Sequence, residues 1–361
     1  MGVTVSESAE GTVMKQHTQR WLHREKEFSA FVNGPLLHFW QRRQEKQFMG
    51  KDSLTIRYVS FTSPRHRRAV LISPGRIESY VKYPEVAYDL FQCGYDVFII
   101  DHRGQGRSDR MLEDSHLGHV EHFSDYVDDL YTLYQREFTT TRYQQKFAVA
   151  HSMGGAILTL LLQRQPDLFD AVTLVAPMFG IVLPMPEWMA EKILNWTETR
   201  SGLREGFALG TGRWHAPPFA MNTLTHSRVR YQRNLRFYAD DPALQVGGPT
   251  AHWVRESMAA GHQILNDAVS ATTPMMILQA EEDQVVDNQA QNAFCEARKR
   301  AGTPCDGAAP DVILGARHEI LFEKDDMRAR ALNVIVRYFE GFKAPTLAIT
   351  TTTPILPDSL V

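Results

Sequence analysis

The sequence has little of several features that would set it apart from an ordinary globular protein. It contains only three cysteines, Cys93, Cys295 and Cys305, without paired spacing, so we expect no disulfide framework and a cytoplasmic location. No apolar run approaches the roughly 20 residues that span a bilayer, and we expect no signal peptide because the N-terminus lacks a basic and an apolar region. The net charge of −3 gives no support for nucleic acid as a partner.

Apolar runs alternate with helical patterns along most of the chain. We expect strands near residues 31–39, 54–61, 69–73, 96–100, 146–151, 171–176, 274–280 and 311–314. Helices are expected near residues 84–93, 121–137, 154–165, 288–301 and 325–342. This alternation predicts an α/β fold with a mostly parallel central sheet flanked by helices.

The alternation stops once, in an aromatic-rich and partly helical segment at residues 178–265. We interpret this segment as a helical cap inserted into a core made of residues 29–177 and 266–343. Residues 1–28 are polar and predict a mobile or loosely docked arm, and residues 344–361 are rich in Thr and Pro and predict a disordered tail.

The most informative stretch is FAVAHSMGG at residues 147–155, in which a short apolar run ends at Ser152. A strand that turns sharply into a helix at a serine is typical of a nucleophile elbow, where the flanking residues must be small. Ala150 replaces the first glycine of the usual G-x-S-x-G pattern. The motif also fits an ordinary strand-to-helix turn, so it indicates a nucleophile only together with an acid and a histidine.

Both partners follow, in the order Ser, Asp, His. The strand expected at residues 274–280 precedes four carboxylates: Glu281, Glu282, Asp283 and Asp287. We favour Asp283 as the acid, because the two valines after it would anchor the loop in the core. A further strand and a small-residue turn lead to His318. This order is expected for α/β-hydrolases and for neither of the other common serine hydrolase folds.

These three residue types together predict acyl-transfer chemistry. The serine hydroxyl needs a base, which His318 would supply, and Asp283 would fix the imidazole tautomer and stabilise its cation. Two backbone N–H groups must also bind the developing oxyanion. We expect them from Met153, directly after the nucleophile, and from Arg76, whose neighbour Gly75 lets the backbone approach closely. The Arg76 side chain is not needed for this role.

Four segments of the chain resemble the monoglyceride lipases and bacterial lysophospholipases, a family of serine α/β-hydrolases. PGRIESYVKY at residues 74–83 is similar to their H-G-x-G-E-H-x-x-R-Y loop, and DHRGQGRS at 101–108 to their D-x-x-G-x-G-x-S loop. HSMGG at 151–155 matches their elbow, and GARHEILFE at 315–323 is most similar to the lysophospholipase L2 branch. The resemblance implies the same triad and oxyanion amides, with Pro74 and Ala150 as departures that bear on rate and specificity.

We expect residues of the cap to determine which substrates the protein prefers. Five apolar residues of the cap recur at helical spacing: Met185, Trp188, Met189, Ile193 and Trp196. This stripe would form an acyl-chain tunnel or a membrane-facing surface, or it would simply pack a cap helix on the core. The cap also contains a basic cluster: Arg228, Arg230, Arg233 and Arg236. These arginines would bind a lysophospholipid phosphate or anionic lipid headgroups, or they would form a solvated helix face.

Other motifs do not support a cofactor or a metal. Gly104 and Gly106 follow a strand but lack the third glycine of a dinucleotide loop, and Phe322 stands where a zinc-protease helix would need its second histidine. We therefore expect no cofactor and no metal site. His151 lies beside the nucleophile, and we expect it to pack rather than to act as the base.

These observations predict a lysophospholipase that cleaves the fatty-acyl ester through an acyl-enzyme. Acyl transfer to another lipid would use the same intermediate. The alternatives are a monoacylglycerol lipase, a general carboxylesterase, or a catalytically silent lipid-binding protein on a hydrolase scaffold. The partners implied are a lysophospholipid or monoacylglycerol substrate and peripheral contact with the anionic inner face of the cytoplasmic membrane.

Overall fold

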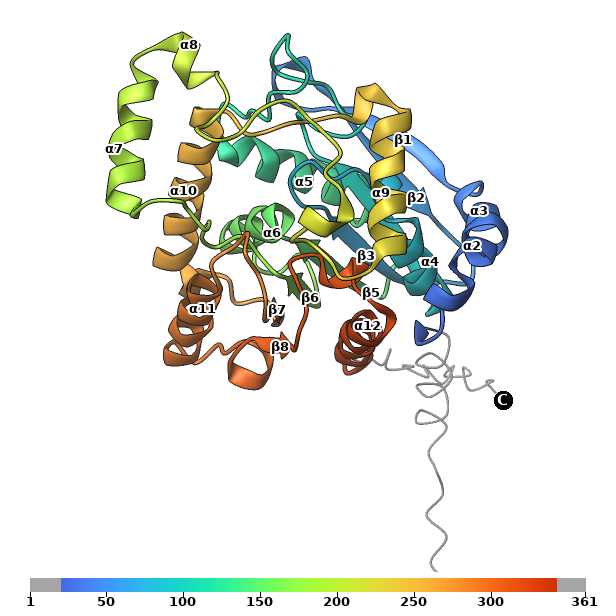
Figure 1. Cartoon of the computed structure of the whole chain (residues 1–361). Coiled ribbons are helices and arrows are strands. Elements are labelled where there is room, and N and C mark those ends of the chain that lie inside the picture. The colour runs from blue at the N-terminus through green and yellow to red at the C-terminus, as the bar shows by residue number, and fades with distance from the viewer. Residues whose placement is uncertain (1–20, 343–361) are drawn as a thin grey trace, which may run out of the picture.

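The computed structural model describes residues 21–342 (Figure 1). Eight strands of this part form one sheet, in the order β1-β2-β4-β3-β5-β6-β7-β8. β2 is antiparallel to both β1 and β4, and the remaining neighbours pair in parallel. The strands are β1 (Gln44–Met49), β2 (Thr55–Phe61), β3 (Arg68–Ser73), β4 (Tyr95–Asp101), β5 (Gln145–His151), β6 (Ala171–Val175), β7 (Met275–Ala280) and β8 (Asp311–Ile313).

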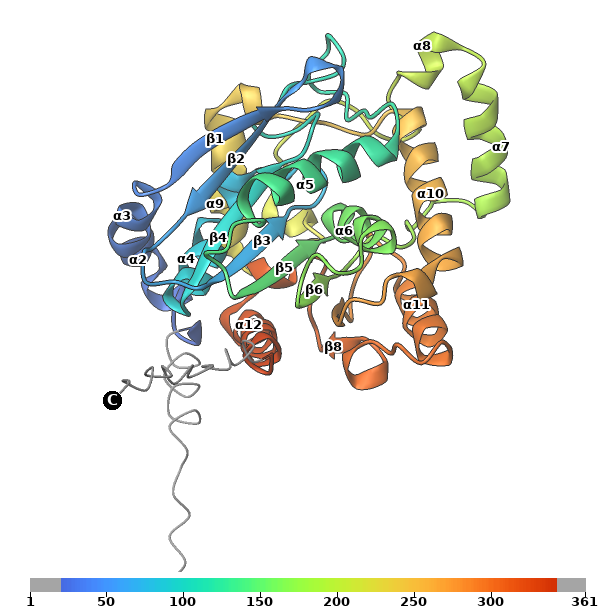
Figure 2. The ribbon, with the colours of Figure 1, turned by 180° about the vertical axis from the view of Figure 1, so that it is seen from behind.

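Helices cover both faces of the sheet (Figures 1 and 2). α5 and α6 pack together on one face with α10, and α4 and α12 lie on the other. The α-helices are α2 (Phe28–Phe31), α3 (Leu37–Trp40), α4 (Pro84–Gln92), α5 (Phe123–Glu137), α6 (Met153–Arg164), α7 (Glu187–Glu198), α8 (Ser201–Arg204), α9 (Arg228–Asp240), α10 (Ala251–Asn266), α11 (Asn288–Arg300) and α12 (Asp325–Glu340). The predicted mostly parallel sheet flanked by helices is confirmed.

The central strands form because their sequences are almost continuously apolar. All residues of β4 and β6 are buried, as a parallel sheet covered on both faces requires. β3 runs parallel to β5, and Ser73 at the end of β3 pairs with Ala150 near the end of β5. The loop after β3 and the turn after β5 therefore leave the sheet side by side, at its carboxyl edge.

The segment before β1 differs from the sequence-based expectation. The strand expected at residues 31–39 is wrong: α2, a π-helical turn at Val32–Leu36 and α3 occupy this region. Phe28, Leu36 and Phe39 are the buried residues, and their spacing is helical. Pro35 has no N–H to donate, and the wider π turn accommodates it.

The end of the expected N-terminal arm is docked rather than loose. Trp21 and Phe28 are buried, and the Arg24 guanidinium forms ion pairs with Asp89 at 2.8 Å and Glu85 at 3.3 Å. The interpretation of residues 1–28 as a loosely docked arm is therefore wrong for 21–28. Residues 1–20 and the tail predicted at 344–361 lie outside the described part of the chain.

The insertion after β6 contains α7, α8 and α9, as the cap hypothesis requires. α10 returns to the core, because Trp253, Ala260 and Ile264 belong to the same buried cluster as the sheet. We therefore place the end of the cap near residue 250, before the boundary of 265 that the sequence suggested.

Candidate active site

Ser152 occupies the apex of a strained turn between β5 and α6. Its backbone angles are φ 52° and ψ −120°, a conformation that is rare for a residue with a side chain. The turn is tight enough that a Cβ on Gly154 would lie 2.1 Å from the carbonyl oxygen of Ser73. A β-carbon at this position is therefore excluded, which explains the small residues after the serine.

A histidine and an aspartate complete a hydrogen-bonded chain with Ser152. His318 Nε2 lies 2.9 Å from Ser152 Oγ, and His318 Nδ1 lies 2.8 Å from Asp283 Oδ2. Asp283 follows β7 and His318 follows β8, so both emerge at the same edge of the sheet as the elbow. In this arrangement the imidazole can take the serine proton while the carboxylate orients the ring.

The structure separates Asp283 from the other three carboxylates considered from the sequence. Glu281 accepts a hydrogen bond from the backbone N–H of Gly315, and Asp287 accepts one from Gln289 at the start of α11. The Glu282 side chain is half exposed. Of the four, Asp283 is the carboxylate that contacts His318.

The surroundings of Asp283 keep it ionised. Burial alone would raise the pKa of its carboxyl, but the hydrogen bond with His318 lowers it. The backbone N–H groups of Val285 and Val286 donate to Oδ1 at 2.8 and 3.1 Å and lower the pKa further. The net pKa lies below its ordinary value, so this carboxylate is negative at neutral pH and suits an orienting role.

The two residues expected to supply oxyanion amides, Arg76 and Met153, stand in a loop that passes close to Ser152 and at the start of the helix that follows it. Met153 is the first residue of α6, where a backbone N–H has no acceptor within the helix. A Cβ on Gly75 would lie 3.2 Å from the Ser152 Cβ, so the loop that carries Arg76 passes close to the nucleophile. The Gly75 N–H itself is occupied, because it donates to Glu78 Oε2 at 2.6 Å.

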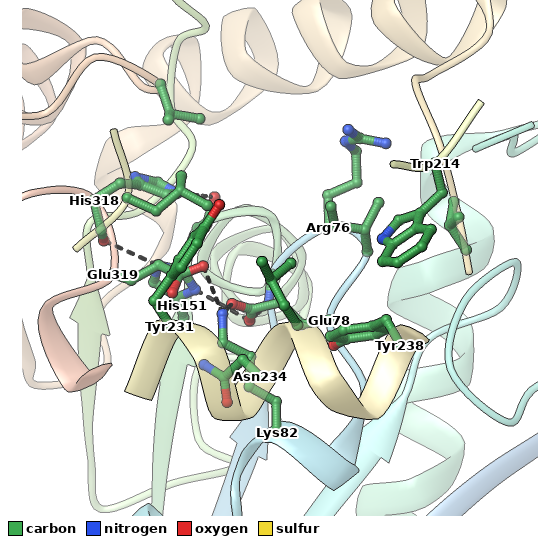
Figure 3. Close-up of a pocket in the computed structure, with 17 residues that line it drawn as sticks. Arg76, Glu78, Lys82, His151, Trp214, Tyr231, Asn234, Tyr238, His318 and Glu319 are labelled. Atoms are coloured by element: carbon green, nitrogen blue, oxygen red, sulfur yellow. Dashed lines mark hydrogen bonds and ion pairs between the residues drawn. The ribbon is translucent and has the colours of Figure 1, made fainter. Parts of the chain in front are cut away.

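A buried group of charges adjoins the triad (Figure 3). Lys82 Nζ donates to Glu78 Oε1 and to Glu319 Oε1, each at 2.6 Å. Glu78 Oε2 also accepts from the Tyr83 hydroxyl at 2.6 Å and lies 3.1 Å from His151 Nδ1. The sequence analysis assigned no role to Glu78, Lys82 or Glu319, although all three stand within the motifs quoted at residues 74–83 and 315–323.

The charged side chains of this group stabilise one another in their ionised forms. Burial would raise the pKa of Glu78, but Lys82 and His151 hold it well below its usual value. Burial would lower the pKa of Lys82, but Glu319 and Glu78 raise it. We expected His151 to pack rather than to act as the base. In addition to packing, it forms hydrogen bonds with Glu78 and with the carbonyl oxygen of His318.

Two cavities meet at Ser152. The first, which we call the polar cavity, has a volume of about 220 Å³ and contains the charged group just described. One face of α9 closes it with Tyr231, Asn234, Leu235 and Tyr238, and Trp214 lines it from the preceding loop. The second, which we call the apolar cavity, has a volume of about 610 Å³. Its lining includes Met178, Met185, Ile193, Leu194, Trp196 and Val254.

The residues predicted to bind substrate from the cap are mostly placed elsewhere. Arg228, Arg230, Arg233 and Arg236 line neither cavity, because the opposite residues of α9 face the polar one. Arg230 is buried in ion pairs with Glu85 and Asp325, whereas Arg228 and Arg236 are exposed. Trp188 is 57 % exposed and lies outside both linings. From the apolar stripe, Met185, Ile193 and Trp196 line the apolar cavity.

Within the described residues, one group of side chains could hold a metal ion: Glu187, Glu191 and His262. All three are exposed and lie outside the linings of both cavities, so the group has no place in the chemistry at Ser152. In the same part of the chain, no helix combines the length and the apolar character needed to cross a membrane.

Comparison with known proteins gives a consistent assignment. Residues 64–325 match the family described as serine aminopeptidase, S33. The chain is 57% identical over 333 residues to lysophospholipase L2 of Escherichia coli K12, covering 92% of this chain and 98% of that protein. It is 30% identical to the probable lysophospholipase L2 of Haemophilus influenzae, over 86% and 97% of the two chains.

A solved structure shares the architecture. A soluble variant of monoglyceride lipase from Saccharomyces cerevisiae, crystallised with a substrate analog, superposes with a TM-score of 0.61. The alignment covers 83% of this chain and 96% of that one at 17% identity, so it supports the fold alone.

Proposed function

Because the chain belongs to the serine aminopeptidase, S33 family of α/β-hydrolases and to its lysophospholipase L2 branch, we propose that it hydrolyses the fatty-acyl ester of lysophospholipids. The family resemblance predicted from the motifs is confirmed. Identity at 57% over nearly the whole length of a named lysophospholipase supports a carboxylic-ester hydrolase.

The proposed reaction uses the hydrogen-bonded chain of Asp283, His318 and Ser152. His318 accepts the proton of Ser152 Oγ as this oxygen attacks the ester carbonyl, and the N–H groups of Arg76 and Met153 donate to the oxyanion. The alcohol leaves with the proton from His318, and an acyl-enzyme remains. Water, deprotonated by the same histidine, then attacks the acyl-enzyme and releases the fatty acid.

The observation that carries this proposal is the meeting of two cavities at Ser152, of which the first has several charged and hydrogen-bonding side chains in its lining and the second has mostly apolar ones. The apolar cavity suits a fatty-acyl chain, because burial of each methylene stabilises binding by about 0.8 kcal/mol. The polar cavity suits a small hydrophilic alcohol such as a glycerophosphodiester. Ser152 lines both, so an ester that spans them has its carbonyl at the nucleophile.

Fatty-acid release from lysophosphatidylethanolamine and from monoacylglycerol of the same acyl chain tests the proposal, with Ser152→Ala as the control. We expect faster release from the lysophospholipid, and none from either lipid with the variant. Preference for the neutral lipid would instead support the second candidate, a monoacylglycerol lipase, which the apolar cavity fits equally well. A silent lipid-binding protein would show no release and no labelling by a fluorophosphonate probe.

We also propose that the mouth of the apolar cavity rests on a membrane surface. Several residues that line this cavity are at the same time large, apolar and exposed: Val182, Ile193, Trp196, Leu203 and Leu209. Trp188 extends this exposed surface along α7. Exposed apolar surface of this kind is typical of membrane or protein contacts, and an acyl chain could pass from the bilayer into the cavity.

Flotation with lipid vesicles tests this contact. We expect Trp188→Ser to reduce the fraction that floats, and vesicles with anionic lipid to bind more protein if Arg228 and Arg236 contribute. Equal flotation of wild type and variant would contradict the proposal. We place this contact on the cytoplasmic face of the inner membrane, because the three cysteines of the sequence show no paired spacing typical of a disulfide framework.

A further inference from the structure

The Arg76 side chain is a cation without a carboxylate partner, in a residue that lines both cavities together with the nucleophile. Its Nη1 donates to the carbonyl oxygen of Gly247 at 3.0 Å, and the guanidinium carbon lies 5.5 Å from the ring centroid of Trp253. No Asp or Glu of residues 21–342 forms an ion pair with it. Burial lowers the pKa of Arg76 to about 10, so the group still carries its charge at neutral pH.

Arginines that are more deeply buried than Arg76 are mostly paired with carboxylates. Arg103 binds the Asp129 carboxylate at 2.7 Å, and Arg230 binds Glu85 and Asp325. Arg233 and Arg298 also lack a carboxylate, but neither lines a cavity at Ser152. Arg76 is partly buried and has no counter-ion, so an anion that enters the site would offset the cost of desolvating its charge.

The location of Arg76 fits a particular anion. With Ser152 and Val285, it lines both the polar and the apolar cavity. Its own backbone N–H is a proposed oxyanion donor. The side chain therefore belongs to the same residue that would bind the reacting carbonyl. In a lysophospholipid the phosphate is attached to the same three-carbon glycerol as the acyl ester, whereas a monoacylglycerol has an uncharged hydroxyl there.

The other cations in the described lining are already paired with carboxylates, and one of them is His151, whose Nδ1 lies 3.1 Å from Glu78. Lys82 is the other arginine or lysine there, and its ammonium is already neutralised by Glu78 and Glu319. We propose that Arg76 binds the phosphodiester of the lysophospholipid and selects it over neutral glycerides. A guanidinium suits this task, because it can donate two parallel hydrogen bonds to one phosphate. This inference rests on the proposed function and replaces the expectation that the Arg76 side chain is not needed.

The test compares Arg76→Met and Arg76→Lys with wild type on lysophosphatidylethanolamine and on monoacylglycerol of the same acyl chain. We expect Arg76→Met to lower kcat/KM for the lysophospholipid by roughly tenfold or more, as loss of a charge-assisted bond implies. Because the backbone N–H of Arg76 is also a proposed oxyanion donor, the losses on monoacylglycerol and on p-nitrophenyl butyrate measure any disturbance of that donor, and the loss on the lysophospholipid should exceed them by roughly tenfold. Arg76→Lys should retain part of the preference. Arg300→Met, at an exposed arginine, is the matched control.

A second readout uses the soluble headgroup alone. Glycerophosphoethanolamine should inhibit p-nitrophenyl butyrate hydrolysis by wild type and by Arg300→Met, but not by Arg76→Met. Equal losses on both lipids, or undiminished inhibition of Arg76→Met, would overturn the phosphate role. Failure of the proposed function would be seen in wild type itself, as an absence of lysophospholipid hydrolysis, whereas failure of this inference would be seen only in the variants.

Discussion

His151 Nε2 lies 3.1 Å from the carbonyl oxygen of His318, so the residue before the nucleophile holds the backbone of the catalytic base. The other ring nitrogen, Nδ1, lies 3.1 Å from the Glu78 carboxylate. Carbonyl and carboxylate oxygens only accept hydrogen bonds, so both contacts form together only when His151 carries protons on both nitrogens. Burial would lower the pKa of His151, but Glu78 raises it above its ordinary value, in agreement with this geometry.

This arrangement predicts a pH-dependent contribution of His151 to stability. Because its pKa is raised in the folded state, its contribution is fully present below the unfolded pKa of about 6.5 and is lost as the pH rises through the folded value. The free energy of unfolding of wild type should exceed that of His151→Gln by more at pH 6 than at pH 9. Denaturant titrations at both pH values measure this difference. A difference that does not change with pH would mean that His151 is not protonated in the folded protein.

The acid of the triad can be tested against its neighbour. Asp283→Asn should lower kcat by roughly 10³- to 10⁴-fold, because the amide no longer fixes the tautomer or stabilises the imidazolium of His318. Glu282→Gln removes a half-exposed carboxylate that does not contact His318 and should leave kcat nearly unchanged. Rates with p-nitrophenyl butyrate provide the measurement, and equal effects of the two changes would refute the assignment.

The elbow should tolerate no β-carbon at Gly154. In Gly154→Ala the new methyl group would lie 2.1 Å from Ser73 O, so α6 and β3 must separate. We expect a loss of about 3 kcal/mol in stability, the upper end of the usual cost of overpacking, and of most fluorophosphonate labelling. Gly202→Ala is the matched control, because its added Cβ would meet nothing within 4 Å. Thermal unfolding and probe labelling of both variants test this prediction, and a Gly154→Ala variant that matches Gly202→Ala in both would contradict it.

Filling the apolar cavity should shorten the preferred acyl chain. Ala190 lies on α7 and lines this cavity, so Ala190→Trp would occupy space that a long chain needs. We expect kcat/KM for long-chain esters to fall while short-chain esters are little affected. Ala239→Trp, on an exposed position of α9, should leave the chain-length profile unchanged. A profile that is the same in Ala190→Trp as in wild type would show that the acyl chain binds elsewhere.

Arg230 should behave as a structural residue and not as a substrate ligand. Arg230→Met leaves Asp325 without its ion pair and leaves Glu85 with only the longer contacts to Arg24 and Arg328, and breaking a buried pair costs about 3–5 kcal/mol. Unfolding by denaturant should show this loss, and any remaining activity should fall equally on charged and neutral lipids. A selective loss on lysophospholipids would restore Arg230 to the substrate-binding role that the sequence suggested.

The sequence predicted the elements best where one physical signal dominated. The apolar runs of β4, β5 and β6 and the small residues around Ser152 each permit few alternatives, and they lie where expected. The segment 28–40 was misread because aromatic residues suit strands, although its buried positions recur at helical spacing. The arginines of α9 were grouped by proximity in sequence, whereas the helix directs them away from the cavity that Tyr231 and Tyr238 face. Only the packing of distant segments could reveal Lys82 between Glu78 and Glu319.

The meeting of two cavities at Ser152 has a consequence for the order of product release. In the proposed reaction, the alcohol fragment can vacate its chamber while the fatty chain stays seated in the other. The emptied chamber then becomes the entrance for the second reactant. Water entering there completes hydrolysis, and a lipid hydroxyl entering there receives the acyl group. After the first product leaves, either water or a lipid hydroxyl can enter the emptied polar cavity. The relative access of these two reactants, more than the triad itself, would set the ratio of hydrolysis to acyl transfer.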